Sequence, residues 1–160
     1  MAATFEDLRV LQEAEAIADA IWKQVTQWDK FARDVVGKQL ARAADSVGAN
    51  IAEAFGRFNF GEKLQFLYYS RGSLFETKYW INRAQVRDLM TSNETRMYGS
   101  QLTELARQLN TFASSLKTVR AEQKTHSRTV RESAPEYVAV DLDEFLIPLF
   151  SEDDLARLSA

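Results

Sequence analysis

The sequence predicts an all-α protein, namely an antiparallel up-down-up-down four-helix bundle with an acidic C-terminal tail. Apolar residues make up 46% of the 160 residues and charged residues 27%, with only six Gly and two Pro, a balance typical of helical proteins. Four long segments carry apolar side chains every three or four residues, which is the spacing of one helix face. Short polar breaks separate these segments, and short connections favour antiparallel neighbours.

The first two helices are expected at about residues 5–28 and 31–58. Thr4 and Asp7 resemble a capped helix start, and Asn59 and Gly61 break the second pattern. The apolar positions of the two segments follow helical spacing. They are Phe5, Leu8, Leu11, Ala18, Ile21, Val25 and Trp28 in the first, and Val36, Leu40, Ala44, Val47, Ile51, Ala54 and Phe58 in the second.

The third helix is expected at about residues 62–90 and the fourth at about 94–124. Apolar and aromatic residues surround most of the third helix, so we expect other elements to cover it on more than one side. The run from Thr91 to Glu94 supplies a turn and a fresh N-cap. The fourth helix has the most regular apolar spacing, typical of a bundle helix. Its positions are Tyr98, Leu102, Leu105, Leu109, Phe112, Leu116 and Val119.

Composition changes after the fourth helix, so we place the bundle at residues 1–124 and the tail at 125–160. The first part has 17 Lys and Arg against 15 Asp and Glu, a net charge of +2, whereas the tail has 3 against 8, a net charge of −5. Both prolines and many acids lie in the tail, which predicts an extended or partly disordered segment. Its apolar runs at 137–140 and 145–147 indicate that the stretch from Tyr137 to Phe150 either packs on its own bundle or ring or acts as an acidic, apolar peptide for another protein. Acid pairs such as Asp153 and Asp154 are expected on a solvated face.

Residue usage excludes several kinds of site. The chain has no Cys, which removes disulfides, thiolate catalysis and Cys-based metal sites, and agrees with a reducing compartment. A single histidine, His126, rules out His-rich metal sites. The N-terminus lacks the pattern of a signal peptide, and no apolar window reaches about 18 residues. We therefore expect a cytoplasmic protein that does not enter membranes and needs no cofactor.

A polar stripe runs along the second helix. Arg42, Ser46, Asn50, Glu53 and Arg57 follow one another at steps of four, four, three and four, so they share one face beside the apolar positions. Such a mixture of charge, amide and hydroxyl is typical of a hydrogen-bond network. Because Glu53 would neutralise an anion site, we favour a structural network between helices or protomers over a ligand or nucleic-acid groove.

Residues of the third helix are expected to complete this network. Arg71 and Glu76 are the predicted partners of the polar stripe, in a pairing that fixes register more than it adds stability. Gly48, Gly56 and Gly72 are interpreted as positions of close helix approach. An aromatic cluster lies beside Arg71, Lys78 and Arg83, where base stacking and subunit packing are alternatives, and we favour packing. The cluster comprises Phe66, Tyr68, Tyr69, Phe75, Tyr79 and Trp80.

Several motifs carry a resemblance to a known family. They are the opening FEDLRVLQEA, Gln39, Arg42-Ala43, Ser46, Asn50-Ile51-Ala52-Glu53, Gly56-Arg57, Phe66-Leu67, Arg71-Gly72-Ser73-Leu74 and Glu76. With these motifs the chain resembles the 23S rRNA intervening-sequence proteins over roughly its first 120 residues. Ala54 departs from the family pattern, which usually has Gly after Asn-Ile-Ala-Glu, and the acidic tail is a second departure.

The resemblance implies an antiparallel four-helix bundle that assembles into a homo-oligomeric ring, most simply a pentamer, and it implies no enzyme. A structurally similar relative is the accessory variability determinant of diversity-generating retroelements, a basic pentameric bundle that partners a reverse transcriptase and nucleic acid. The bundle part of the present chain, at +2, has little of the positive charge that nucleic-acid binding normally requires.

Two functional hypotheses follow. The first is a non-catalytic, ring-forming helical scaffold or adaptor that displays repeated surfaces to a protein partner. The alternative is a nucleic-acid-binding accessory protein that partners a reverse transcriptase and contacts RNA or DNA phosphates through Arg42, Arg57, Lys63 and Arg71. An enzyme is the third class, and it would need an active site without Cys and with at most one His.

Overall fold

The computed structural model describes residues 8–127 and 148–160, with side chains described up to residue 120 and from residue 148. This part of the chain is entirely helical and contains no strand, which confirms the predicted all-α class. The expected helix start at Thr4 and Asp7 lies outside the described residues, as do the apolar runs at 137–140 and 145–147. The elements are α1 (Arg9–Val25), α2 (Lys30–Ala32), a π-helix (Arg33–Gly37), α3 (Lys38–Gly56), α4 (Phe60–Val86), α5 (Ser92–Ser127) and α6 (Glu152–Ser159).

The first break in the chain lies earlier than the apolar pattern predicts. Helix α1 ends at Val25, and Asp29 caps the next helix by accepting hydrogen bonds from the backbone N–H groups of Phe31 (2.9 Å) and Ala32 (3.1 Å). From Lys30 the chain stays helical to Gly56, with one stretch of wider π-helical turns inside it. The predicted second helix is therefore three consecutive helical elements.

The connection between α4 and α5 satisfies its backbone groups locally. Asp88 takes a left-handed conformation (φ 58°), its N–H donates to Gln85 O, and the N–H of Leu89 donates to Ala84 O at 2.8 Å. This is a Schellman ending with Asp where Gly is usual. Thr91 and Glu94 then form a capping box, in which each side chain accepts a hydrogen bond from the other's backbone N–H. The predicted N-cap in this turn is confirmed.

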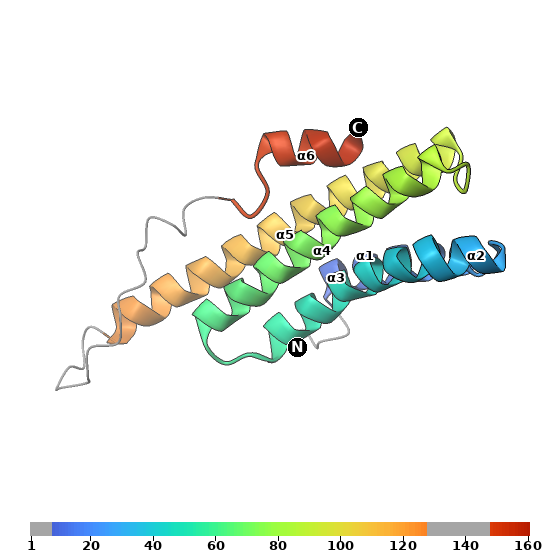
Figure 1. The fold of residues 1–160 in the computed structure, drawn as a ribbon. Coiled ribbons are helices and arrows are strands. Elements are labelled where there is room, and N and C mark those ends of the chain that lie inside the picture. The colour runs from blue at the N-terminus through green and yellow to red at the C-terminus, as the bar shows by residue number, and fades with distance from the viewer. Residues whose placement is uncertain (1–7, 128–147) are drawn as a thin grey trace.

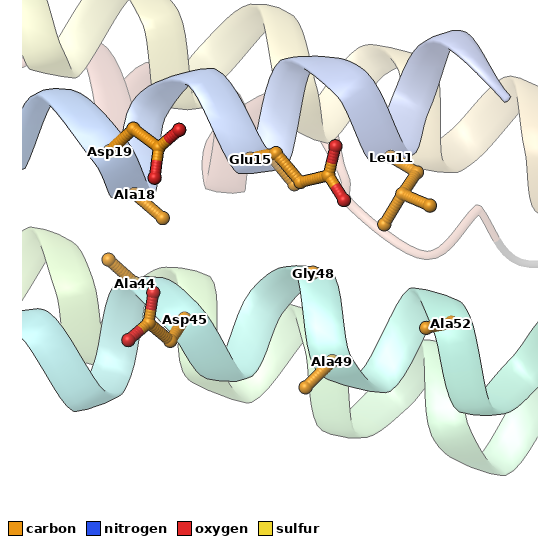
Figure 2. Close-up of a pocket in the computed structure, with 10 residues that line it drawn as sticks. Leu11, Glu15, Ala18, Asp19, Ala44, Asp45, Gly48, Ala49 and Ala52 are labelled. Carbon is orange, nitrogen blue, oxygen red and sulfur yellow. The ribbon is translucent and has the colours of Figure 1, made fainter. Parts of the chain in front are cut away.

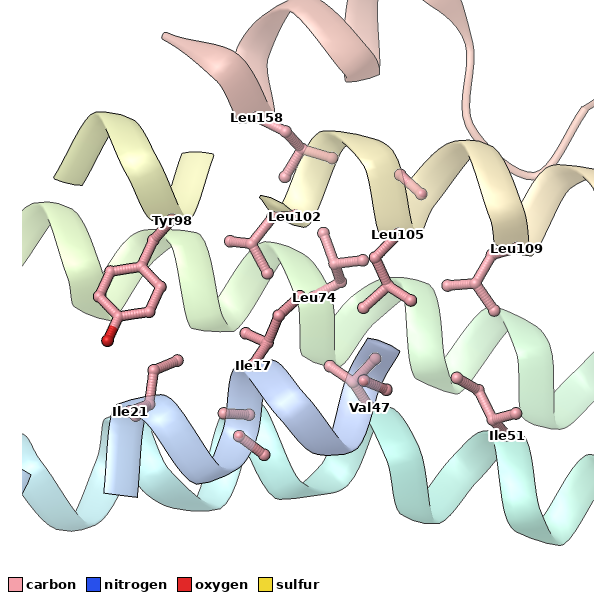
Figure 3. Packing of buried hydrophobic residues seen from close by; sticks show 14 of the residues in the cluster. Ile17, Ile21, Val47, Ile51, Leu74, Tyr98, Leu102, Leu105, Leu109 and Leu158 are labelled. Carbon is pink, nitrogen blue, oxygen red and sulfur yellow. The ribbon is translucent and has the colours of Figure 1, made fainter. Parts of the chain in front are cut away.

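The four long helices share one hydrophobic core. Helix α3 packs against α1 and α4, while α5 packs against α4 and α1 (Figure 1). Ile17 and Ile21 of α1, Ile51 of α3 and Leu74 of α4 meet the leucines of α5 in the interior (Figure 3). On α5 the predicted apolar positions are buried from Tyr98 to Leu109, partly buried at Phe112 and Leu116, and exposed at Val119.

Helix α6 was not anticipated from the sequence. It lies outside the four long helices, packed on α5, and Leu158 points from it toward α5 (Figures 1 and 3). Its first turn carries a capping box between Ser151 and Asp154. Part of the predicted tail is therefore a folded helix docked on the protein.

The glycines that allow close contact are not those expected. A Cβ added at Gly56 or Gly72 would meet nothing within 4 Å, and at Gly48 it would make only ordinary contacts. The interpretation of these three as sites of close approach is therefore wrong within the described chain. A Cβ at Gly37 would lie 2.5 Å from Val25 Cγ1, and one at Gly99 would lie 2.9 Å from the backbone oxygen of Leu158.

Candidate functional site

The polar stripe (Arg42, Ser46, Asn50, Glu53 and Arg57) lies on the outer side of α3, and most of its hydrogen bonds stay within that helix. The hydroxyl of Ser46 donates to Arg42 O (2.7 Å), and the amide of Asn50 donates to Ser46 O (2.8 Å). Arg57 forms an ion pair with Glu53, whose side chains are 41% and 46% exposed. Exposed pairs of this kind add little stability. Arg42 and Glu53 of the stripe are exposed, whereas Ser46, Asn50 and Arg57 are half-buried.

One hydrogen bond joins the polar stripe to α4. The Asn50 amide donates to the Ser73 hydroxyl at 3.5 Å, the limit of a hydrogen bond. Glu76, the second predicted partner on α4, accepts instead from the indole N–H of Trp80, one turn further along the same helix, at 3.4 Å. The expected hydrogen-bond network between the polar stripe and α4 is therefore reduced to this single long hydrogen bond.

Arg71, the first predicted partner, belongs to a different site. Its Nε donates to the backbone oxygen of Leu149 (2.7 Å), and its guanidinium forms an ion pair with Asp154 of α6 (3.0 Å). Positions 71 and 73 are separated by about 200° around a helix, so Arg71 points away from the side on which Ser73 meets α3. This corrects the predicted pairing of Arg71 with the polar stripe.

The same contact corrects the expectation that Asp154 is solvated. Its side chain is only 16% exposed. Burial by itself would raise the pKa of Asp154, but hydrogen bonds from the Ser151 backbone, Arg71 and the Ser151 hydroxyl outweigh it and leave the pKa below its ordinary value. Asp153 beside it is exposed, as expected.

A basic pocket lies where the α3–α4 turn meets α5. Its volume is about 270 Å³. The guanidinium of Arg120 lies over the ring of Phe60 (4.8 Å) and that of Arg57 over Phe66 (4.8 Å), while Lys63 donates to Phe55 O at 3.4 Å. The lining residues are Arg57, Phe58, Phe60, Lys63, Leu116, Val119 and Arg120. Cations beside aromatic faces are the groups that hold phosphates and stacked bases.

Two of the four predicted nucleic-acid contacts, Arg57 and Lys63, therefore meet in the basic pocket. Arg42 lies about 22 Å along α3 from Arg57, and Arg71 is bound to the C-terminal residues. Sequence reasoning missed Arg120, because it comes from α5, and no local pattern connects it with Lys63.

A groove of about 440 Å³ lies between α1 and α3. Small residues such as Ala18, Ala44 and Gly48 line it, with the carboxylates of Glu15, Asp19 and Asp45 along it (Figure 2). The small side chains leave the space between the two helices unfilled, and the acids repel anionic ligands. Among the described residues no group of three or more acids or histidines is placed to hold a metal ion. We interpret the groove as a helix-packing feature.

The comparison with known families decides what this helical chain is. The family model described as 23S rRNA-intervening sequence protein matches residues 6–111. The chain belongs to this family. The match contains the polar stripe and α4, and it ends within α5, before Arg120 and α6. A search of the curated proteins found no match to this family member. None of its described helices combines the length and the apolar character needed to cross a membrane.

Proposed function

We propose that this intervening-sequence family protein is a non-catalytic helical scaffold that assembles into a homo-oligomeric ring, a pentamer in the simplest case, and displays repeated surfaces to a cytoplasmic partner. The protomer in this proposal is an up-down-up-down four-helix bundle, which the contacts of α1 and α4 with both α3 and α5 support. The lack of Cys and the single His support a non-catalytic role.

The observation that carries the proposal is an apolar face on α4 that the described chain leaves uncovered. Tyr68, Tyr79 and Val86 are 45%, 55% and 68% exposed. With Gly72 they follow one another at steps of four, seven and seven, so they share one side of the helix. We call these four residues the α4 outer face. Apolar side chains that share one exposed helix face can meet a protein partner together, and Tyr is enriched in protein interfaces.

Two features suit this face to a second copy of the chain. Nothing lies within 4 Å of a Cβ built at Gly72, so a neighbouring side chain can approach the backbone of α4 there. The polar stripe on adjacent α3 exposes both signs of charge, in Arg42 and Glu53, and so can supply the polar rim of a head-to-tail contact between neighbouring copies of a ring. An apolar centre with a charged rim is the usual anatomy of a subunit interface.

The test is the mass of the intact assembly for Tyr79→Ser, with Trp22→Ser as the matched control. Both side chains are exposed aromatics in helices, at 55% and 59%, but Trp22 lies on α1. We expect an oligomer for the unchanged protein and the control, and a loss of mass toward the monomer for Tyr79→Ser, measured by native mass spectrometry. A monomeric unchanged protein, or equal masses for both variants, would contradict the proposal.

The basic pocket favours a second candidate function, a nucleic-acid-binding accessory protein that partners a reverse transcriptase, like the accessory variability determinant of diversity-generating retroelements. Arg57, Lys63 and Arg120 gather there beside Phe58, whose side chain is fully exposed. Together they offer phosphate contacts and one face for base stacking.

Binding of labelled single-stranded RNA and DNA over a salt series tests this second function. We expect affinity that falls steeply with salt, and a smaller slope for Lys63→Gln than for the control Lys23→Gln on α1. Phe58→Ala should weaken binding about 5- to 100-fold if a base stacks on it, with the exposed Phe31→Ala as its control. No binding at low salt would exclude this function and leave the scaffold proposal standing.

A further inference from the structure

The C-terminal segment, residues 148–160, forms its own compact unit on the protein surface. The Ser151 hydroxyl accepts from the Asp154 N–H (3.2 Å), and an Asp154 carboxylate oxygen accepts from the Ser151 N–H (2.9 Å), which caps α6 at its first turn. The helix therefore has a local reason to form, separate from its contacts with α4 and α5.

Two side chains of the long helices hold the segment by its backbone. Asn110 of α5 donates to Phe150 O (2.8 Å) and accepts from the Phe150 N–H (2.7 Å), so one amide side chain satisfies both backbone groups of a single residue. Arg71 of α4 holds Leu149 O and Asp154 at the same time. These contacts recognise the backbone of two residues that lead into a capped helix.

The surface beneath the segment is shaped for apolar side chains and for a backbone. Phe150 is 1% exposed, with its ring centroid 5.9 Å from that of Phe75 on α4, and Leu155 and Leu158 are buried. A Cβ at Gly99 would lie 2.9 Å from Leu158 O, so only the absence of a side chain there lets α6 approach α5. We call the surface formed by Arg71, Phe75, Gly99 and Asn110 the docking groove.

The charges of the C-terminal segment and of the docking groove are complementary. The segment has three acidic residues and one basic residue. Arg71 meets its Asp154, and Lys78 Nζ lies 3.5 Å from the position of the Gly99 Cβ, close to the carbonyls of Leu158 and Ser159 that end α6. A cation near the last carbonyls of a helix is favourable. The groove thus fits an acidic, amphipathic helix in one orientation.

We propose that the docking groove is a peptide-binding site and that residues 148–160 are its built-in, detachable ligand. The chemistry it selects is Leu-Phe-Ser followed by about two helical turns with Asp at the third helical position and Leu at the fourth and seventh. A partner peptide of this pattern, or the segment of a second copy, competes for the same place. This inference does not depend on the ring or on nucleic-acid binding.

The placement of the segment supports its detachment. Helix α6 packs on the outside of the four long helices, with only the side chains of its inner face joined to their hydrophobic core, and a hollow of about 340 Å³ remains between α5 and α6. Twenty residues, 128–147, join α5 to the segment, and a chain of this length can span up to about 70 Å. Water can replace the bonds of Arg71, which is 33% exposed even with the segment docked.

The experiment uses the full chain with a site-specific protease sequence inserted after residue 134. After cleavage, a fluorescent synthetic peptide of residues 148–160 is added and its anisotropy is measured. We expect the cut protein to keep its helical circular dichroism and to exchange its segment for the labelled peptide. The uncut protein should bind the peptide about 10- to 1000-fold more weakly, because the tethered segment competes at an effective concentration of the order of millimolar.

Variants on both sides of the contact sharpen the result. The peptide with Phe150→Ala should lose binding without any change in the protein, and Asn110→Ala should weaken binding, whereas Gln101→Ala, at an exposed position of α5, should not. Three outcomes would overturn the proposal: unfolding of the protein on cleavage, no exchange over hours, or equal binding of the unchanged and Phe150→Ala peptides.

Discussion

Two helical glycines offer the same substitution in opposite surroundings. At Gly48 in α3, an added Cβ would lie 3.7 Å from Ala14 Cβ and 3.8 Å from Leu11 Cδ1, which are ordinary contacts. At Gly99 in α5, it would lie 2.9 Å from the backbone oxygen of Leu158. Neither glycine has a positive φ, so Ala fits the backbone at both. The difference between the two sites is therefore the neighbour alone.

The two substitutions are expected to act in opposite directions, one stabilising the protein and the other weakening the docking of α6. Replacing a helical Gly by Ala gains up to about 1 kcal/mol in propensity, so Gly48→Ala should raise the free energy of unfolding by about 0.5–1 kcal/mol. In Gly99→Ala the added methyl group would clash with the Leu158 carbonyl, so the end of α6 must shift from α5. Because burying one leucine contributes about 1.5–3 kcal/mol, partial exposure of Leu158 should weaken α6 docking by about 1–3 kcal/mol.

Urea unfolding followed by circular dichroism measures the first effect, and amide hydrogen exchange of α6 measures the second. Docking weakened by 1–3 kcal/mol corresponds to exchange in α6 that is faster by roughly 5- to 150-fold. Exchange in α3 should be unchanged or slower in Gly48→Ala. If Gly99→Ala leaves α6 protection unchanged, or if Gly48→Ala destabilises the protein, the steric argument fails.

Three further predictions concern side-chain hydrogen bonds. Because the pKa of Asp154 is lowered in the folded protein, the ionised carboxylate should contribute fully to α6 docking above about pH 4. This contribution should be lost as the pH falls through the lower pKa of the folded state. Hydrogen exchange of α6 over a pH series checks this, and Asp154→Asn should remove the pH dependence. Thr91→Ala breaks the capping box with Glu94 and should cost about 1 kcal/mol in urea unfolding, whereas Thr91→Ser should cost far less. Tyr98→Phe removes the hydroxyl that donates to the side-chain oxygen of Gln24 at 2.9 Å, and it should lower the free energy of unfolding in urea by about 1–2 kcal/mol. An unchanged urea midpoint would count against this contact.

The long helices could be predicted because their signals are local. Apolar spacing located α1, α3, α4 and α5, and the turn chemistry of Asn59 and of Thr91 with Glu94 placed their ends within a few residues. The break after Val25 was missed because the apolar spacing continues to Trp28. The sign of the break is the N-cap of the next helix, which depends on the single side chain of Asp29. Local patterns therefore fixed the elements better than their boundaries.

The sites were harder to predict because they combine distant residues. Arg71 and Asp154 are separated by 83 positions, and in one dimension nothing distinguishes Asp154 from its solvated neighbour Asp153. The Ser-x-x-Asp pattern from Ser151, followed by Leu155 and Leu158, was the available sign of α6. Eight residues are too few for periodicity to stand out against the acidic composition around them.

The π-helical turns at Arg33–Gly37 determine how the helical residues before them are rotated about the helix axis. Ala32, Val36, Leu40 and Ala44 are all buried at intervals of four residues, a spacing that drifts by about 40° per step in a regular α-helix. Wider turns absorb part of that drift and keep Ala32 in line with the interior. Deleting one residue there, such as exposed Val35, would leave a continuous helix but rotate its beginning by about 100°. The number of residues in this short segment thus sets which way the residues before it face around the helix axis. It thereby sets the direction in which the chain connects to α1.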